Sequence, residues 1–449
     1  MEYGEHMGKK REEWTGTFGF IMASAGSAVG LGNLWKFPYL AGMYGGGLFV
    51  IVYLVMVFIV GFTLILGELA VGRYAKSNAV SAFQKINSKF AFVGYLGVIS
   101  SFVILSFYSV VGGWILKYIF SFLTSTDFSD SEAIFGNFIS SAASPVIWHI
   151  LFLTICIIIV LGGVSKGIER ASVFMMPALL VMIIFVAVQG ILLDGAHKGL
   201  EFYLKPNTET FSFKAVAVAL GQVFFSLSLG MGTLITYGSY LSKKEKLVKS
   251  SMLIAGLDTL IALLAGFAIL PAVFALGMKP DSGPSLMFIT LPKVFMQMPG
   301  GIWVGTIFFI LLIFAAITSV ISLLEVIITY FVEKHNLKRR TAAFITALIL
   351  YITGSVTSLS QGPLEGFKIL GKNIFDFLDM LASNFLLPLG GLFLCIVIGF
   401  IWKPKNAIKE ITNENSIKFR LKSLWVVLIK YVMPVCIVFI ILDTLGIFS

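Results

Sequence analysis

The sequence predicts an all-α integral membrane protein with eleven transmembrane helices. Of its 449 residues, 58% are hydrophobic and only 12% are charged, and the mean hydropathy is +0.95. Soluble domains carry about 25% charged residues. Apolar runs long enough to cross about 30 Å of hydrocarbon recur along the whole chain. We therefore expect one transmembrane domain over residues 1–449.

Eleven apolar runs follow one another in the chain. The first and the sixth are the least uniformly apolar. The first run lacks the short core and small-residue cleavage site of a secretory leader, so no cleavable signal is expected. The predicted spans are 17–42, 47–72, 91–122, 146–163, 168–193, 213–241, 250–277, 301–332, 340–358, 374–402 and 423–446.

Positive charge is concentrated in alternate connections between these runs. With the N-terminus in the cytoplasm, 23 of the 33 Lys and Arg residues lie in cytoplasmic segments and 7 lie in outer loops. This asymmetry follows the positive-inside rule. It predicts a multi-pass protein of the cell inner (plasma) membrane, with an extracellular or periplasmic C-terminus. The net charge of +10 is then a consequence of topology, and no nucleic-acid partner is expected.

The cysteine and histidine patterns do not indicate catalysis. Cys156, Cys395 and Cys436 lie inside predicted spans without CxxC spacing, so they are predicted to be buried apolar residues. The four histidines are scattered and form no HExxH or HxxxH pair. No nucleophile–base pair is evident either, so a membrane enzyme is disfavoured.

Two spans contain residues that weaken a helix. The first contains GSAVGLGNLWKFPY at residues 26–39, and the sixth contains FFSLSLGMGTLITYGSY at residues 224–240. In a helix interior, glycine costs about 1 kcal/mol and proline about 3 kcal/mol relative to alanine. Unpaired backbone groups cannot face lipid, so such breaks line a polar cavity or bind ions. Close helix packing through small residues is the alternative interpretation.

The positions of the two breaks predict an inverted repeat. The second break lies five spans after the first, so residues 14–193 and 213–402 are expected to be two halves with opposite orientation, and 423–446 an extra C-terminal helix. Helices 1 and 6 would be unwound at the bilayer midplane, where a substrate site is expected. Free carbonyls suit Na⁺, and the N-termini of half-helices suit a carboxylate.

Several polar residues lie deep inside predicted spans, where they are usually functional. Asp258 lies about ten residues into its span and needs a partner charge, for which Na⁺ is suitable. Thr318 and Ser319 either bind an ion or bond back to their own helix. Glu68 either supports the free N–H groups of a broken helix or contacts substrate. Tyr108 either packs against neighbouring helices or contacts the substrate.

Several ordered stretches resemble the neurotransmitter:sodium symporter family, and most closely its short bacterial amino-acid transporters with eleven helices. The stretches are FGFIMASAGSAVGLGNLWKFPY, YGGGLFVIVY, GELAVGR, GQVFFSLSLGMG, GPSLMFITLP and FAAITS. The resemblance runs almost end to end. It implies sodium-coupled symport of an L-amino acid into the cell by alternating access, in a monomer or weak homodimer within the lipid bilayer.

The resemblance also implies two sodium sites. The first would use Ala28, Asn33, Ser226 and Asp258 together with the substrate carboxylate, and the second Gly26, Val29, Ala315, Thr318 and Ser319. Many relatives carry asparagine where this chain has Asp258. Chloride-dependent relatives carry a serine where it has Ala262. No chloride requirement is therefore expected.

The substrate pocket implied by the resemblance lies between the two breaks. Gly30 occupies the position where monoamine transporters carry an aspartate, so the ligand must bring its own carboxylate. Met231 replaces a bulky aromatic residue, which favours hydrophobic or aromatic amino acids such as leucine, tyrosine or tryptophan. The pocket residues would be Ala28, Gly30, Leu31, Gly32, Ile104, Tyr108, Phe225, Ser226, Ser228, Met231, Ser319 and Leu323.

Gates are implied on both sides of this pocket. The outer gate would be Lys36 and Asp379, with Tyr108 and Phe225 as an aromatic lid. The inner gate would comprise Arg11, Trp14, Ser239, Tyr240 and Glu333. In close relatives the spacing of Gly167 and Pro177 marks where helix 5 unwinds.

Two other functions stay open at this level. An ion channel would use rings of like groups along an open pore, whereas these polar groups converge on one pocket. A non-transporting amino-acid sensor of the same fold would bind ligand equally well. Such a sensor usually carries a cytoplasmic output domain.

Overall fold

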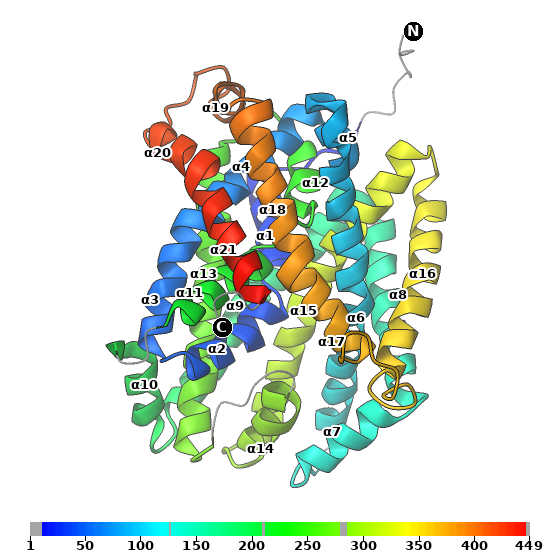
Figure 1. The fold of residues 1–449 in the computed structure, drawn as a ribbon. Coiled ribbons are helices and arrows are strands. Elements are labelled where there is room, and N and C mark those ends of the chain that lie inside the picture. The colour runs from blue at the N-terminus through cyan, green and yellow to red at the C-terminus, as the bar shows by residue number, and fades with distance from the viewer. Residues whose placement is uncertain (1–10, 125–126, 209–211, 279–284, 446–449) are drawn as a thin grey trace.

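The structure is a computed structural model that describes residues 11–124, 127–208, 212–278 and 285–445. These residues form helices and connecting turns, and no β-strand occurs among them. Most helices run between two faces of the molecule (Figure 1). We call the upper face, with the N-terminal segment, α5 (Ala79–Ile86) and α19 (Pro404–Ile411), the N-terminal face. The opposite face carries α7, α10 and α14.

The helical elements fall into two halves of the chain, in which η marks short 3-10 or π turns. The first half contains α1 Thr17–Ala28, η1 Gly32–Lys36, α2 Phe37–Met43, α3 Gly47–Met56, η2 Val57–Gly61, α4 Phe62–Ala75, α5 Ala79–Ile86, η3 Ser88–Phe90, α6 Ala91–Leu123, α7 Ser131–Ser140, α8 Ser144–Leu161, η4 Val164–Glu169, α9 Arg170–Ile191 and α10 Ala196–Leu204.

The second half follows the same pattern of long helices joined by short ones. It contains α11 Phe213–Ser226, α12 Thr233–Ser239, α13 Leu247–Ala275, η6 Leu286–Thr290, α14 Leu291–Met296, α15 Gly301–Lys334, α16 Arg339–Leu359, α17 Ile374–Met380, η7 Leu381–Leu386, α18 Leu387–Ile396, η8 Val397–Ile401, α19 Pro404–Ile411, α20 Lys422–Val427, η9 Leu428–Val432 and α21 Met433–Thr444.

Nine helical stretches in the described residues are long and apolar enough to cross a membrane. The bent pair Thr17–Ala28 and Gly32–Met43 forms a tenth. Each of these ten coincides with a predicted span to within four residues. The predicted sixth span, 213–241, consists instead of the two shorter helices α11 and α12. A total of eleven crossings therefore stays a prediction.

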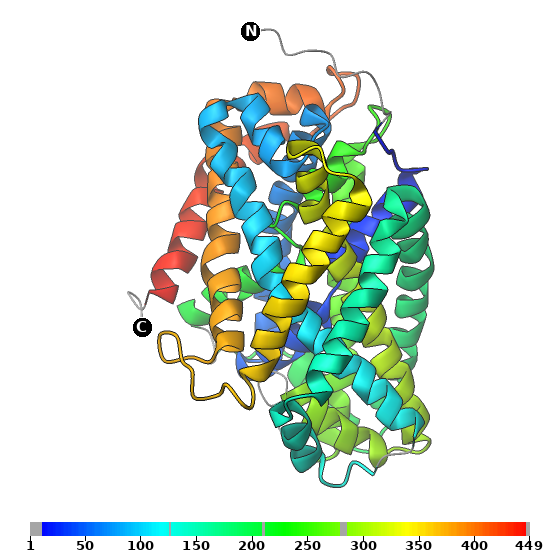
Figure 2. The ribbon, with the colours of Figure 1, turned by 90° about the vertical axis from the view of Figure 1, so that its right-hand side faces the viewer.

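The broken first helix lies at the centre of the helix bundle. It packs against α9, α13 and α15. α15 is the most enclosed of the long helices, with 83% of its apolar stretch buried. Figure 2 shows α16, in yellow, and α18, in orange, running between the two faces at the periphery. The irregular backbone of the first helix is thus surrounded by protein, as a polar backbone in a membrane must be.

Candidate functional site

The first helix is interrupted between Ala28 and Gly32. After α1 the backbone becomes extended at Val29 (φ −67°, ψ 104°), and the two helical parts meet at 54°. A Cβ at Gly30 would lie 2.7 Å from the Tyr108 hydroxyl and 2.8 Å from Ser319 Oγ. A side chain at this position would therefore have to displace both hydroxyls. The next N–H, of Leu31, donates to the Tyr108 hydroxyl at 2.8 Å.

The second interruption joins α11 to α12. Ser228, Gly230 and Gly232 have φ values of 53°, 77° and 78°, so the chain cannot continue as a right-handed helix. Glu68 on α4 accepts the Gly230 N–H at 2.8 Å through Oε1. This contact is the one expected of a residue that supports a broken helix, which was one of the two predicted roles of Glu68.

A small cavity of about 20 Å³ lies between the two breaks. The structure brings eleven of the twelve predicted pocket residues together around it, and the twelfth, Leu31, lines a neighbouring cavity. Ser27 is an additional lining residue that the sequence did not indicate. The lining residues are Ser27, Ala28, Gly30, Gly32, Ile104, Tyr108, Phe225, Ser226, Ser228, Met231, Ser319 and Leu323.

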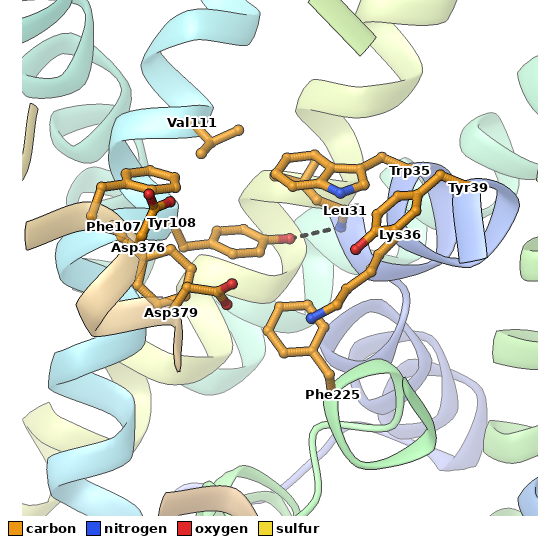
Figure 3. Close-up of a pocket in the computed structure, with 12 residues that line it drawn as sticks. Leu31, Trp35, Lys36, Tyr39, Phe107, Tyr108, Val111, Phe225, Asp376 and Asp379 are labelled. Carbon is orange, nitrogen blue, oxygen red and sulfur yellow. Dashed lines mark hydrogen bonds between the residues drawn. The ribbon is translucent and has the colours of Figure 1, made fainter. Parts of the chain in front are cut away.

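The neighbouring cavity of about 180 Å³ is shown in Figure 3. Gly32, Tyr108 and Phe225 line both cavities, so the two cavities are adjacent and share these residues as a wall. The remaining lining residues of the wider cavity are Leu31, Trp35, Lys36, Tyr39, Phe107, Val111, Phe375, Asp376 and Asp379.

Charged side chains face the wider cavity from two elements. Lys36 Nζ lies 4.9 Å from the centre of the Phe225 ring, and Asp379 lies across the cavity on α17 (Figure 3). No ion pair between Lys36 and Asp379 occurs among the described residues. Asp376 adds a second carboxylate that we did not predict, although its i, i+3 spacing from Asp379 was visible in the sequence.

Asn33, Ser226 and Asp258 form one buried polar cluster. Asn33 Nδ2 donates to Asp258 Oδ1 at 2.7 Å and to Ser226 Oγ at 2.8 Å, and Ser226 Oγ donates to Asp258 Oδ2 at 2.8 Å. Tyr53, which we did not predict, places its hydroxyl 3.5 Å from Asp258 Oδ2. None of the ion pairs between described residues involves Asp258. A buried carboxylate without a cation is unfavourable, so this cluster suits a small cation.

Backbone carbonyls converge on Ser319 at the end of α1. Ser319 Oγ lies 3.3 Å from the carbonyl oxygens of Ser27 and Val29 and 3.5 Å from that of Gly26. A hydroxyl has one proton, so it cannot satisfy three acceptors at once. The surplus of oxygen lone pairs is the environment that a hard cation prefers.

Thr318 lies beside this group of oxygens. Its hydroxyl donates to its own helix, at 3.0 Å to the Phe314 carbonyl and 3.1 Å to the Ala315 carbonyl, as the back-bonding alternative predicts. A Cβ at Gly26 would lie 3.0 Å from the Thr318 Cβ, so α1 and α15 are in close contact at this point. The lone pairs of Thr318 Oγ1 stay available, since the hydroxyl acts as a donor in both bonds.

The predicted inner gate residues are assembled at the N-terminal face. Arg11 forms an ion pair with Glu333 and donates to Ser239 Oγ at 2.7 Å, and its guanidinium carbon lies 4.8 Å from the centre of the Tyr240 ring. Asn78, which we did not predict, donates its N–H to Glu333 Oε2 at 2.6 Å. We call this group the latch.

Trp14 and Lys76 extend the latch. Trp14 Nε1 donates to the Tyr237 carbonyl at 3.0 Å, and its ring packs edge-on against Tyr237. Lys76 follows α4 and donates to the Leu241 carbonyl. Burial lowers the pKa of the Lys76 ammonium, and the nearby Arg11 charge lowers it further. These contacts hold the N-terminal segment over the end of α12.

The stretch between Gly167 and Pro177 is helical in this structure. Gly167 lies in the π turn η4 (Val164–Glu169), and Pro177 lies inside α9 (Arg170–Ile191). The unwinding implied by this spacing is therefore absent from this arrangement, and its occurrence in another state stays a prediction.

This arrangement is that of a membrane transport protein rather than an enzyme. Two broken helices enclose a small cavity, with the latch toward one face of the molecule and a wider cavity adjacent to it. Over residues 11–132 and 137–449 the chain matches the Sodium:neurotransmitter symporter family, and it belongs to that family.

Individual relatives agree with this assignment. The chain is 35% identical over 98% of its length to "Uncharacterized sodium-dependent transporter YhdH" of Bacillus subtilis, covering 99% of that protein. It is 26% identical over 96% of its length to the human "Sodium- and chloride-dependent taurine transporter", covering 78% of that protein. Among solved structures it is similar to MhsT in complex with L-phenylalanine, with a TM-score of 0.90 and 41% identity over 97% of this chain and 100% of that chain.

Proposed function

We propose that this protein is a symporter that couples sodium entry to the uptake of a hydrophobic or aromatic L-amino acid. The observation that carries the proposal is the cavity between the two helix breaks. It lies next to the Asp258 cluster and next to the carbonyl oxygens that surround the Ser319 hydroxyl, which we call the Ser319 group. Sodium-dependent relatives support the coupling ion. The relative crystallised with phenylalanine supports the substrate class.

The substrate class follows from Gly30. Gly30 offers no carboxylate that would pair with a simple amine. The ligand must therefore carry its own carboxylate. We expect that carboxylate to take over the Leu31 N–H and the Tyr108 hydroxyl, which bond each other in this structure. The side-chain end of the cavity is apolar, with Ile104 and Met231 among its lining residues.

Two sodium ions would bind next to the substrate. The first would lie at the Asp258 cluster, with Ala28, Asn33 and Ser226 and the substrate carboxylate as further ligands. The second would lie at the Ser319 group, between α1 and α15, with ligands from Gly26, Val29, Ala315, Thr318 and Ser319. Both groups are rich in oxygen and contain buried lone pairs without enough donors.

Transport should not need chloride. The relatives that transport taurine are sodium- and chloride-dependent by name. In this chain Asp258 provides a fixed negative charge among the first-site residues, and Ala262 on the same helix has no hydroxyl to offer an anion. The Asp258 carboxylate would supply the negative charge that a bound chloride supplies in chloride-dependent relatives.

Alternating access would use the gates on both sides. The latch is closed in this structure, so with the N-terminal face in the cytoplasm the site is closed on the cytoplasmic side. Tyr108 and Phe225 form part of the wall between the substrate pocket and the wider cavity. Closure would bring Lys36 and Asp379 together above Phe225. Release into the cell would require the latch to open and α9 to unwind between Gly167 and Pro177. Each Na⁺ that enters down 100 mV adds about 2.3 kcal/mol of driving force.

Eleven spans, a cytoplasmic N-terminus and inverted repeats 14–193 and 213–402 belong to the same proposal. Uptake of labelled L-phenylalanine or L-leucine into proteoliposomes tests the function. We expect saturable uptake that needs an inward sodium gradient and increases with an inside-negative potential. Binding without uptake would favour a sensor, and non-saturable sodium current without substrate would favour a channel.

A further inference from the structure

We propose that Ser228, Ser27 and Ser322 form a serine relay. The relay couples sodium binding at the Ser319 group to substrate binding in the pocket. The three residues act as positioning residues, because they transmit a change at one site to the other. The inference rests on the proposed function and adds the means by which sodium and substrate affect each other.

The relay crosses three elements through short hydrogen bonds. Ser228 Oγ, in the break between α11 and α12, donates to the Ser27 carbonyl on α1 at 2.8 Å. Ser27 Oγ donates to Ser322 Oγ on α15 at 2.8 Å. Ser322 Oγ donates to the Ser319 carbonyl at 2.7 Å. All four residues are buried from bulk solvent.

These bonds differ from the usual behaviour of serine in a buried helix. Such a serine normally bonds back to the carbonyl four residues earlier. Ser100 on α6 does so, with its Oγ 2.7 Å from the Leu96 carbonyl. Ser27 and Ser228 instead donate to other elements. The Ser27 hydroxyl therefore joins α1 to α15, and the Ser228 hydroxyl joins the second break to α1. Ser322 alone bonds back to its own helix, at the Ser319 carbonyl.

Backbone strain at Ser228 indicates that its side chain is needed. Its φ of 53° lies in the left-handed region, where a residue with a Cβ is disfavoured and glycine is not. The neighbouring Gly230 and Gly232 take the same region without strain. A serine kept at such a position is consistent with a role for its hydroxyl, which bonds Ser27.

The Ser27 carbonyl is the point at which the two sites meet, and the Ser27 and Ser322 hydroxyls hold it in place by bonding α1 to α15. Without either hydroxyl the carbonyl can shift, so a change at one site is no longer passed to the other. It accepts from Ser228 Oγ and lies 3.3 Å from Ser319 Oγ. A cation at the Ser319 group must be met by the lone pairs of Ser319 Oγ, so the proton of that hydroxyl turns away from the carbonyls. The Ser27 carbonyl then loses one donor and binds Ser228 more strongly. Because Ser27 and Ser228 both line the substrate cavity, sodium binding changes the shape of that cavity.

The relay predicts a loss of coupling rather than a loss of binding. Coupling between two ligands is typically 5-fold to 150-fold and is reciprocal. We would measure the Kd of labelled L-phenylalanine at low and at saturating sodium, and the Kd of sodium with and without L-phenylalanine. The coupling ratio is the L-phenylalanine Kd at low sodium divided by its Kd at saturating sodium. In Ser27→Ala and Ser322→Ala we expect this ratio to fall at least 5-fold. The sodium Kd without substrate should change less than 2-fold.

Controls separate coupling from general damage. Ser100→Ala removes a buried hydroxyl that bonds only within its own helix, and it should leave the ratio unchanged. Ser228→Gly removes the hydroxyl while relieving the backbone strain, so it should fold and still lose coupling. A relay also predicts that Ser27→Ala and Ser228→Gly together lower the ratio little more than either change alone.

Two results would overturn the inference in different ways. If the wild-type protein shows strong coupling and Ser27→Ala and Ser322→Ala keep the same ratio, the relay is wrong and the proposed function stands. If the wild-type protein binds L-phenylalanine equally well with and without sodium, the proposed function fails and the relay fails with it.

Discussion

Asp258 is a buried carboxylate that receives hydrogen bonds from Asn33 and Ser226 and faces the Tyr53 hydroxyl. Three neutral partners orient its charge without balancing it. A negative charge left in a low-dielectric site attracts a cation strongly, provided that the site has room and further oxygen ligands. In the proposed function, Asp258 would therefore determine both ion binding and chloride independence.

Asp258→Asn should raise the sodium concentration needed for half-maximal uptake by at least tenfold when gluconate replaces chloride. The change keeps the size of the side chain and removes its charge. Hydrogen bonds to charged groups are worth about 1.5–3 kcal/mol, and about 1.4 kcal/mol corresponds to a factor of ten. Uptake measured over a range of sodium concentrations checks this.

The same variant should respond to chloride, because an anion near the site can supply part of the missing charge. Asp194→Asn removes an exposed carboxylate and serves as the control, with no expected change. Equal sodium dependence of Asp258→Asn and wild type would contradict the role given to Asp258.

Gly30→Ala should abolish or weaken amino-acid binding by at least tenfold. The added Cβ would lie 2.7 Å from the Tyr108 hydroxyl and 2.8 Å from Ser319 Oγ, so both hydroxyls must move to make room for the methyl group. Gly221→Ala is the matched control, because nothing lies within 4 Å of a Cβ there. Binding of labelled L-phenylalanine to detergent-solubilised protein measures both. Normal binding by Gly30→Ala would show that the cavity lies elsewhere.

At the scale of elements, the latch determines whether α1 can move. Arg11→Ala removes the ion pair with Glu333 and the bond to Ser239. We expect faster hydrogen exchange in residues 11–28 and in α12, because the segment opens more often. Arg170→Ala, at an exposed position, should leave exchange unchanged. Exchange that is no faster in Arg11→Ala would mean that the latch does not hold this end of α1.

α9 is expected to unwind during inward release. Pro177 supplies no N–H to this helix, and Pro177→Ala would restore one and stabilise the helical form. Uptake should then become slower while equilibrium binding of L-phenylalanine stays within 2-fold of wild type. A parallel loss of uptake and binding would instead show that Pro177 shapes the site itself.

The sequence predicted the long helices well and the irregular parts less well. Hydropathy defines ten spans to within four residues, because an apolar run of sufficient length has few other possible structures in a membrane. The serines and glycines of 224–240 also predicted an interruption of the sixth span, and in the structure α11 ends at Ser226 and α12 begins at Thr233. The sequence did not define these end points, which follow from the left-handed backbone at Ser228, Gly230 and Gly232.

The residues missed at the site have a common cause. Tyr53, Ser27 and Ser322 are single polar residues in apolar surroundings, and their partners lie on other helices. Nothing in the local sequence distinguishes them from serines that bond to their own helix. The residues that were predicted came from the resemblance or from unusual positions such as Gly30 and Asp258.

For the whole molecule, transport follows from two broken helices held among long, straight ones. The closed latch separates the site from the N-terminal face, and the wider cavity lies next to the site. Sodium would favour an outward-facing arrangement, and bound substrate would then allow closure. Because a ligand shifts a conformational equilibrium only through its differential affinity, sodium and substrate must bind cooperatively for their fluxes to be coupled.

Calorimetric titration of the purified protein with L-phenylalanine and L-leucine, in sodium buffer and in potassium buffer of equal ionic strength, tests this most directly. We predict that the preferred amino acid binds at least tenfold more tightly in sodium than in potassium. Identical affinity in the two buffers would show that the oxygens at the helix breaks do not hold sodium, and sodium-coupled transport by this site would be contradicted.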